Sequence, residues 1–327
     1  MWNRGKTYPY GWNQQSVNFK EVMITHPNVK INLGLNVIRR REDGFHDLET
    51  LFVPYFGLHD TLEIIVGDDY SRTSAALFSR YGSSVPVNQQ NPGPEEVFGV
   101  EWQENAAPKI VQGMSEDGSL MITIAREEGV DWDPLNDLTA KAYGILAADF
   151  KLPPVKIFLE KTSPVGAGLG GGSADAAFAL KMLNEICGLG LSQQQLAGYA
   201  SMLGSDCPFF IYNRPMIGEG RGEVLSETDM PFSLETYDIQ VVTPAGIAVS
   251  TKDAYAGIRP HVPEIPLRDA LARPVEEWDG VVVNDFEETV FAKYPELAAI
   301  KRSLYDSGAI YASMSGSGSA LFAIYSR

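Results

Sequence analysis

The sequence predicts a protein of about two domains in which helices and strands both occur. Its 327 residues exceed one average domain, since domains usually hold roughly 100 to 200 residues. Alternating apolar residues at 155–159 indicate a strand, and apolar residues at helical spacing in 176–187 indicate a helix. A glycine-rich run at 166–172 connects the two. The centre of the chain is therefore predicted to be strand, glycine loop and helix.

Composition and charge exclude two kinds of partner. The chain is 44% hydrophobic and 21% charged, as is usual for a globular protein, and no apolar run approaches the roughly 20 residues of a membrane span. Its net charge of −16 disfavours contact with a phosphate backbone, which requires a dense surface of lysine and arginine. We therefore expect neither a membrane nor a nucleic acid as a partner.

The cysteines and histidines suggest no metal site built by the protein. Cys187 and Cys207 lie in or beside apolar segments and form no Cys-x-x-Cys, which fits a reducing cytoplasm. The four histidines show no metal-ligand spacing. We expect a cytoplasmic protein in which no residue is assigned to a metal.

Four segments organise the chain. Residues 1–22 show no periodicity and are expected to be a disordered extension, or the result of a start codon assigned too early. Residues 23–212 are predicted to form an N-terminal domain and residues 213–327 a C-terminal domain. Residues 67–118 lose clear periodicity, which predicts an irregular insertion.

Other elements follow from the same patterns. An Asp-Gly pair at Asp43 and Gly44 predicts a hairpin between two strands. Strands are predicted at 29–37, 45–53, 60–66, 120–125, 239–244 and 321–325, and helices at 137–148, at 192–203, from 249 and after 284.

The glycine loop has a possible chemical use. A helix N-terminus exposes unpaired N–H groups, and glycines let an anion approach them closely. Gly166, Gly168 and Gly171 match Gly-x-Gly-x-x-Gly, but no Walker A motif is present. A dinucleotide-binding fold is rejected because a second helix, starting at Ser192, follows where a strand is required. A flexible linker is the alternative, although the flanking strand and helix favour a phosphate-binding loop.

Three further features each allow two interpretations. Lys30 and Asn32 share one face of a strand, where a lysine is either a solvated edge residue or a functional cation. Asp206 is either the N-cap of a helix that starts at Cys207 or a functional carboxylate. The glycine-rich segment 315–318 is either a hairpin turn or a loop that packs against the first one.

Several motifs in one order resemble the GHMP kinases. They lie at residues 30–33, 43–46, 164–177, 203–208 and 315–318, and the resemblance covers about residues 23–327 without the insertion. It implies a two-domain α+β fold, with an N-terminal domain like domain 2 of ribosomal protein S5 and a ferredoxin-like C-terminal domain.

The resemblance also implies an activity. It indicates a kinase that uses ATP and Mg²⁺ to phosphorylate a hydroxyl of a cytidine-diphosphate-linked polyol, in non-mevalonate isoprenoid (terpenoid) biosynthesis. We expect a monomer or a weak homodimer. One alternative is a GHMP kinase of the homoserine or mevalonate type, and another is a non-catalytic nucleotide-binding sensor.

Site residues carry over motif by motif. Asp206 is expected to be the general base and Lys30 to lie beside it. The residues expected to bind ATP are Lys161, Pro164, Val165, Gly166, Ala167, Gly168, Leu169, Gly170, Gly171, Gly172, Ser173 and Ala174. Ser173 is able to bond a phosphate oxygen or approach the magnesium ion.

The resemblance assigns a second group to the acceptor substrate. This group is Asn32, Phe45, His46, Thr251 and Tyr255, and the second glycine loop contributes Gly316 and Gly318. Phe45 and Tyr255 are expected to sandwich the cytosine, and His46 to bond its edge.

Two positions depart from the family pattern. Asn28 and Val29 precede Lys30 where the family has Pro-Ala, and Asp137 with Leu138 replaces an Asn-Leu pair near the adenine. No adenine contact is therefore predicted.

Overall fold

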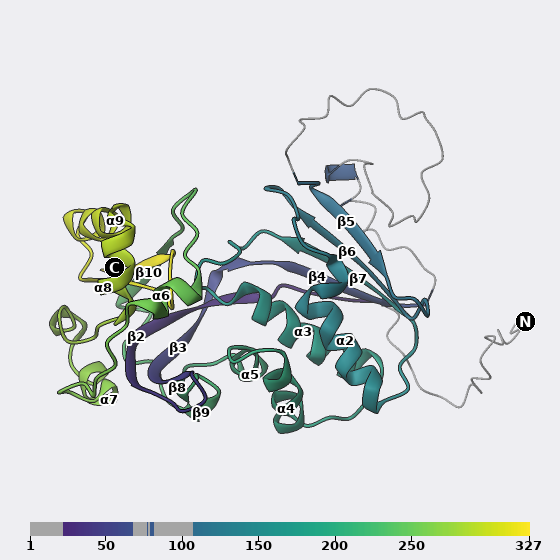
Figure 1. Cartoon of the computed structure of the whole chain (residues 1–327), viewed down its shortest axis with the longest axis horizontal. Coiled ribbons are helices and arrows are strands. Elements are labelled where there is room, and N and C mark those ends of the chain that lie inside the picture. The colour runs from purple at the N-terminus through teal and green to yellow at the C-terminus, as the bar shows by residue number, and fades with distance from the viewer. Residues whose placement is uncertain (1–21, 68–76, 78, 82–106) are drawn as a thin grey trace, which may run out of the picture.

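A computed structural model describes residues 22–67, 77, 79–81 and 107–327 (Figure 1). The expected extension at 1–22 lies outside the described residues except for Val22, and so does most of the expected insertion. Within the described residues, no helix is long and apolar enough to cross a membrane.

A five-stranded sheet forms one side of the N-terminal part. Its strands, in spatial order, are β1 (Val22–Thr25), β4 (Thr61–Val66), β7 (Val155–Lys161), β6 (Leu120–Arg126) and β5 (Ile110–Met114). β6 and β7 are parallel and the other pairs are antiparallel. The prediction of irregular structure up to residue 118 was wrong for β5, whose short strand contains Gln112 and Gly113 and so shows weak alternation.

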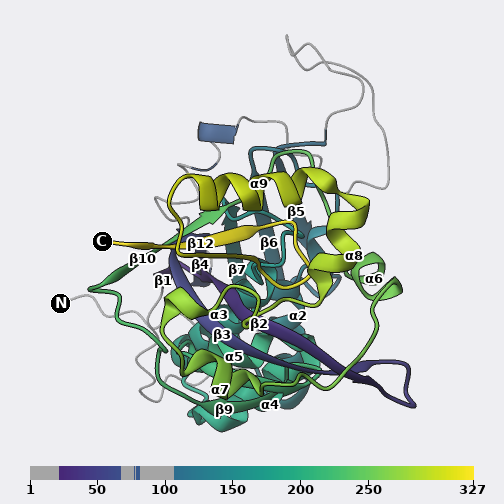
Figure 2. The ribbon, with the colours of Figure 1, turned by 90° about the vertical axis from the view of Figure 1, so that its left-hand side faces the viewer.

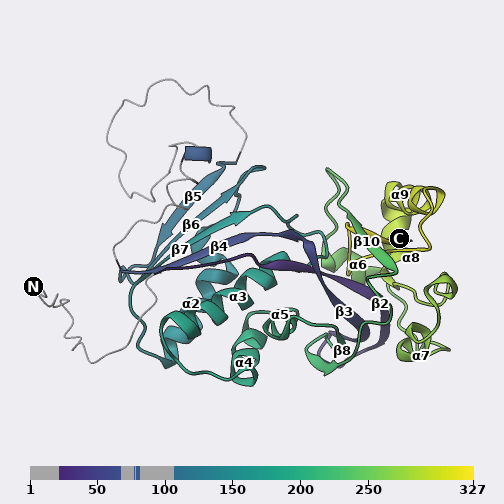
Figure 3. The same cartoon turned by 180° about the vertical axis from the view of Figure 1, so that it is seen from behind.

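Helices cover one face of this sheet (Figure 3). They are η1 (Pro134–Asn136), α2 (Leu138–Asp149), α3 (Gly171–Ile186), α4 (Gln193–Leu203) and α5 (Cys207–Tyr212). Ile64, Ile124 and Ile157 of the sheet belong to the same buried cluster as Leu180 and Leu183 of α3. The capping box predicted at Ser192 is confirmed, with Gln195 as its second member. This core holds the first turn of α3 in place.

Two long strands join the two halves of the molecule (Figure 1). A four-stranded antiparallel sheet has the order β2 (Asn28–Arg40), β3 (His46–His59), β8 (Met216–Gly220) and β9 (Val224–Glu227). β8 and β9 follow residue 213, where we place the start of a C-terminal domain, and β8 pairs with β3. The domain division therefore remains a proposal.

β2 has one face in the core and an opposite face that carries polar side chains. Val29, Ile31 and Leu33 are buried in a cluster with residues of the C-terminal part, so Lys30 and Asn32 point to the opposite side. The predicted alternation up to Val37 is interrupted at Gly34, where φ is +67° and the register with β3 shifts. A side chain there would collide with Leu267, since a Cβ would lie 2.5 Å from its Cδ1.

The C-terminal part packs helices on a small antiparallel sheet (Figure 2). Its strands have the order β10 (Tyr237–Val242), β12 (Leu321–Ser326) and β11 (Tyr311–Met314). The helices are α6 (Thr251–Ala256), α7 (Leu267–Leu271), η2 (Val275–Glu277), α8 (Phe286–Lys293) and α9 (Pro295–Asp306). Leu35 of β2 forms a bridge with Asn284, which joins this part to the long strands.

Candidate active site

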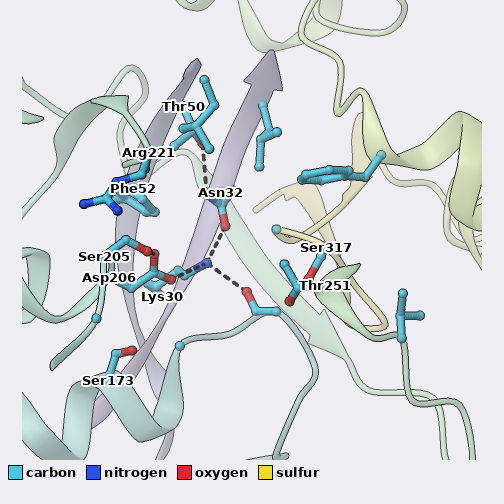
Figure 4. A pocket seen from close by; sticks show the side chains of 18 of the residues that line it. Lys30, Asn32, Thr50, Phe52, Ser173, Ser205, Asp206, Arg221, Thr251 and Ser317 are labelled. Carbon is cyan, nitrogen blue, oxygen red and sulfur yellow. Dashed lines mark hydrogen bonds and ion pairs between the residues drawn. The ribbon is translucent and has the colours of Figure 1, made fainter. Parts of the chain in front are cut away.

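A cavity of about 520 Å³ lies where the two parts meet (Figure 4). Its lining comes from β2 and β3, both glycine loops, the turn before α5, and the start of α6. We call it the catalytic cavity. Lys30, Asn32, Ser173 and Asp206 all line it, although they are far apart in the sequence.

The Lys30 ammonium is held by three oxygen atoms. Its Nζ donates to Asn32 Oδ1 at 2.5 Å and to the carbonyl of Gly168 at 2.9 Å, and it lies 3.5 Å from Asp206 Oδ2. Burial lowers the pKa of Lys30, and the Asp206 carboxylate opposes this shift but does not cancel it. The predicted pairing of a strand lysine with a distant aspartate is therefore present in the structure.

Asp206 is the N-cap residue of α5 and also lines the cavity. It precedes α5, which Pro208 helps to start, but its side chain makes no cap hydrogen bond. The predicted N-cap position is therefore confirmed, but the side chain does not cap the helix and is left to the cavity. With 29% of the side chain exposed, the carboxylate faces Lys30 and remains open to the cavity.

A short hydrogen-bonded chain orients Asn32. Its Nδ2 donates to Thr50 Oγ1 at 3.0 Å, and Thr50 Oγ1 donates to the Gly34 carbonyl at 2.5 Å. Because the amide nitrogen is bound to Thr50, the amide oxygen points at Lys30. Asn32 was predicted to bind substrate; it lines the cavity, but its amide is occupied by these two neighbours.

The first glycine loop presents its backbone to the cavity. Gly170, with φ of +71°, is the N-cap of α3, and Gly166 and Gly168 also have positive φ. These three glycines and Ser173 line the cavity, so the first turn of α3 and its free N–H groups lie at the cavity wall.

The other residues predicted to bind ATP have different surroundings. The side chains of Ala167, Leu169 and Ala174 are buried in the core and hold the loop in position. Neither these three residues nor Pro164, Val165, Gly171 and Gly172 line the catalytic cavity.

The second glycine loop is both a hairpin turn and a loop packed against the first. It connects the antiparallel strands β11 and β12, and Ser315 Oγ donates to the Gly168 carbonyl at 3.1 Å. A Cβ on Gly168 would lie 2.2 Å from the Ser315 carbonyl oxygen, and one on Gly316 would lie 3.4 Å from Lys30 Nζ. Both predicted interpretations of this loop are therefore correct. Gly316 lines the cavity, and Gly318 lies behind it against Met314.

Lys161 lies on the core side of the first loop. Its Nζ donates to Asp60 Oδ2 and to Asp175 Oδ2, each at 2.5 Å, and only 5% of the residue is exposed. Burial lowers the pKa of Lys161, but the two carboxylates together raise it by more than burial lowers it. The pKa therefore lies above its ordinary value. Lys161 does not line the catalytic cavity, and its role in binding ATP stays a prediction.

A second cavity of about 620 Å³ adjoins the first, and we call it the aromatic cavity. It contains Phe45, His46 and Tyr255, and shares five lining residues with the catalytic cavity: Gly204, Ser205, Arg221, Thr251 and Tyr255. The two cavities therefore adjoin each other along these residues.

The rings of the aromatic cavity contact neighbouring side chains. His46 stacks on Tyr255 with centroids 4.8 Å apart, and the Arg221 guanidinium lies 5.0 Å from the Phe45 ring centroid. His46 therefore covers part of Tyr255, and Arg221 covers part of Phe45. Burial lowers the pKa of His46, and Arg40 lowers it further, which favours the neutral ring and leaves one nitrogen able to accept a hydrogen bond.

Sequence reasoning missed several lining residues. Thr50 and Arg221 line the catalytic cavity but belong to none of the motifs above, and Ser205 and Ser317 lie within two of those motifs but received no predicted role. Thr251, which was predicted to bind substrate, has its Oγ1 atom 3.3 Å from Ser317 Oγ. The one available signal was Arg221 between two glycines, a pattern of a hairpin tip.

Comparison with known proteins places these features in a family. The family described as "GHMP kinases N terminal domain" matches residues 137–214, and "GHMP kinases C terminal" matches residues 269–327. These segments include both glycine loops.

Individual relatives agree with that match. A 4-diphosphocytidyl-2-C-methyl-D-erythritol kinase of Bacteroides fragilis is 42% identical over 304 residues, which cover 93% of this chain and 92% of the relative. The enzyme of the same name from Parabacteroides distasonis is 39% identical over 305 residues, with coverage of 93% and 92%.

Solved structures give the same result. A crystal structure of 4-(cytidine 5'-diphospho)-2C-methyl-D-erythritol kinase superposes with a TM-score of 0.64 at 28% identity, covering 92% of this chain and 89% of the other. A homoserine kinase from Cytophaga hutchinsonii has a TM-score of 0.58 at 14% identity, covers 95% and 87% of the two chains, and shows a shared fold alone. The expected two-domain α+β fold of the GHMP kinases is thereby confirmed. The chain belongs to the 4-diphosphocytidyl-2-C-methyl-D-erythritol kinases, within the GHMP kinases.

Proposed function

We infer that this chain transfers the terminal phosphoryl group of ATP to a hydroxyl of 4-diphosphocytidyl-2-C-methyl-D-erythritol, a step of non-mevalonate isoprenoid biosynthesis. The observation that carries this function is the 3.5 Å approach of Lys30 and Asp206 beside the first glycine loop. A phosphate-binding backbone, a carboxylate and a fixed cation thus border one cavity. The adjoining aromatic cavity provides room for a nucleobase.

Each catalytic group has a role that its position supports. The Asp206 carboxylate accepts the proton of the attacking hydroxyl, because it is exposed to the cavity and remains close to a cation. Lys30 faces the negative charge that develops on the transferring phosphoryl group. Its three fixed partners hold the ammonium in place before the reaction, so little reorganisation is required.

The glycine loop supplies the nucleotide site in this proposal. Its backbone N–H groups and the N-terminus of α3 bind the phosphates of ATP. Magnesium bound with ATP takes most of its ligands from phosphates and water, and needs one or two protein oxygens. The Ser173 hydroxyl lines the cavity at the first turn of α3 and fits that requirement. The ion would neutralise charge between the phosphates.

The acceptor specificity is assigned to the aromatic cavity. Phe45 and Tyr255 are the proposed stacking residues for cytosine, and His46 is the proposed partner for its edge. His46 stacks on one face of Tyr255, so a base that stacks on that same face would displace the His46 ring. A monomer or weak homodimer in the cytoplasm also remains part of the proposal.

The function is tested by measuring ATP consumption with three acceptors in parallel. We expect turnover with 4-diphosphocytidyl-2-C-methyl-D-erythritol and none above background with homoserine or mevalonate. Turnover with homoserine or mevalonate instead would assign the chain to another GHMP kinase type. ATP binding without turnover on any acceptor would indicate a nucleotide sensor.

A further inference from the structure

The two cavities are connected at Arg221, a residue outside every motif considered above. Arg221 occupies the tip of the β8–β9 hairpin between Gly220 and Gly222, whose φ values are +68° and +103°. It lines both the catalytic cavity and the aromatic cavity. Figure 4 shows Arg221 at the edge of the catalytic cavity, above Ser205 and Asp206.

The charges around the two cavities favour an anion at this position. Lys30, Arg221 and Lys252 are the lysines and arginines in the two linings, whereas Asp206 is the one carboxylate in them. The whole chain, by contrast, carries a net charge of −16. Lys30 lines only the catalytic cavity, where it pairs with Asp206, and Lys252 lines only the aromatic cavity. Arg221 is therefore the cation that both cavities share.

The hairpin holds the guanidinium by one edge. Glu223 Oε2 accepts from the backbone N–H of Arg221 at 2.6 Å, and Glu223 Oε1 accepts from Nε at 3.3 Å. Among the described residues, neither terminal nitrogen of this guanidinium has a hydrogen-bond partner. Two parallel N–H donors on one planar group match two phosphate oxygens, a geometry that lysine does not provide.

The same guanidinium lies over Phe45, with 5.0 Å between Cζ and the ring centroid. A cation held at this distance fixes the orientation of the ring and interacts favourably with its face. Phe45 is 54% exposed, so the rest of its surface remains open to a ligand. One contact therefore links the proposed base-binding ring to the proposed anion-binding group.

We propose that Arg221 binds the diphosphate of the substrate and that this contact is coupled through Phe45 to base binding. This inference rests on the proposed function. The diphosphate then lies between the aromatic cavity, which holds the base, and the catalytic cavity, which holds the hydroxyl. Arg221 is a specificity and positioning residue in this arrangement.

Calorimetric titrations with cytidine and with cytidine 5'-diphosphate test the anion contact. Arg221→Gln should weaken binding of the diphosphate about tenfold or more, as expected for loss of a charge-assisted pair, and weaken binding of cytidine less, by at most about fivefold, because cytidine loses only the support that Arg221 gives to Phe45. The affinity of Arg221→Lys for the diphosphate should lie between those of the wild type and of Arg221→Gln, because lysine keeps the charge and loses the planar donor pair. The matched control is Arg214→Gln, which removes an arginine that pairs with Glu227 of the same hairpin and lines neither cavity.

The outcomes separate this inference from the proposed function. If Arg221→Gln binds cytidine 5'-diphosphate as tightly as the wild type, the role of Arg221 is overturned and the proposed function is not. Equal losses of affinity for cytidine and for its diphosphate lead to the same conclusion. Failure of the wild-type chain to bind the diphosphate overturns the proposed function as well. Coupling is tested with Arg221→Gln, Phe45→Ala and the double variant, whose effects on KM for the substrate should be non-additive. Additive effects would overturn the coupling.

Discussion

Two buried lysines on opposite sides of the first glycine loop show how different the two environments are. Lys30 and Lys161 are 3% and 5% exposed, so exposure does not distinguish them. Lys161 contacts two carboxylates that are each 1% exposed. Lys30 contacts one carboxylate that is 29% exposed, together with two neutral oxygens.

Their pKa values move in opposite directions for this reason. Burial lowers both, but two carboxylates reverse the effect at Lys161, whereas the single carboxylate of Asp206 does not reverse it at Lys30. Lys161 is therefore a fixed charge within the core. Lys30 has one carboxylate partner and lies beside a cavity, so it can interact with a further negative group there. A phosphoryl transfer site requires such a cation.

The largest expected effect is on stability, from Lys161→Met. The change leaves Asp60 and Asp175 buried without their cation, which costs about 3–5 kcal/mol in free energy of unfolding. Urea denaturation measures this loss. Adding Asp175→Asn should restore part of it, because one uncompensated charge is removed. A stable Lys161→Met protein whose Michaelis constant for ATP rises sharply would instead place Lys161 in the nucleotide site.

The second effect is on turnover, from Asp206→Asn. Loss of the general base should lower kcat about a hundredfold or more, with ATP binding nearly unchanged. Stability should change little, because the carboxylate is partly exposed and its lysine retains two other oxygen partners. Steady-state kinetics and ATP titration measure the two quantities. Near-wild-type turnover would remove Asp206 from the role of base.

The third effect is on pH dependence. Because burial lowers the pKa of Lys30, kcat should fall up to about tenfold per pH unit on an alkaline limb that lies below pH ~10.4, the usual lysine value. The folded chain loses this proton before the unfolded chain, so deprotonation of Lys30 does not itself lower stability. Lys161, with its raised pKa, contributes stability that persists below that pH and is lost only above it. Kinetics and urea denaturation across pH 7 to 10, in steps of roughly one unit, distinguish the two lysines; parallel losses would contradict the assignment.

The smallest effect is expected from Thr50→Val. The substitution removes the hydroxyl that accepts from Asn32 and donates to Gly34, so the Asn32 amide loses the bond that fixes its orientation. A cost of about 1 kcal/mol, or roughly fivefold in kcat, corresponds to one hydrogen bond. Thr50→Ser, which retains the hydroxyl, is the control. Equal kinetics for the two variants would show that Asn32 needs no such support.

Local patterns in the sequence were sufficient for much of the fold. Alternation predicted β7, and helical spacing predicted α3. The Asp-Gly pair predicted the hairpin that joins β2 to β3, and Ser192 marked the start of α4. These features depend on neighbours within a few residues. β5 escaped prediction because most of its stabilisation comes from pairing with β6 and from burial, which local periodicity does not record.

The sequence by itself determined that a strand lysine, two glycine loops and an aspartate are present in an order similar to the GHMP kinases. The approach of Lys30 to Asp206 was expected only through the family resemblance, and tertiary structure alone decided that Lys161 turns into the core and that Arg221 reaches both cavities. The physical reason is that each of these contacts joins residues from distant elements. Which partner a buried charge acquires therefore depends on how the sheets and helices pack, and no local pattern specifies it.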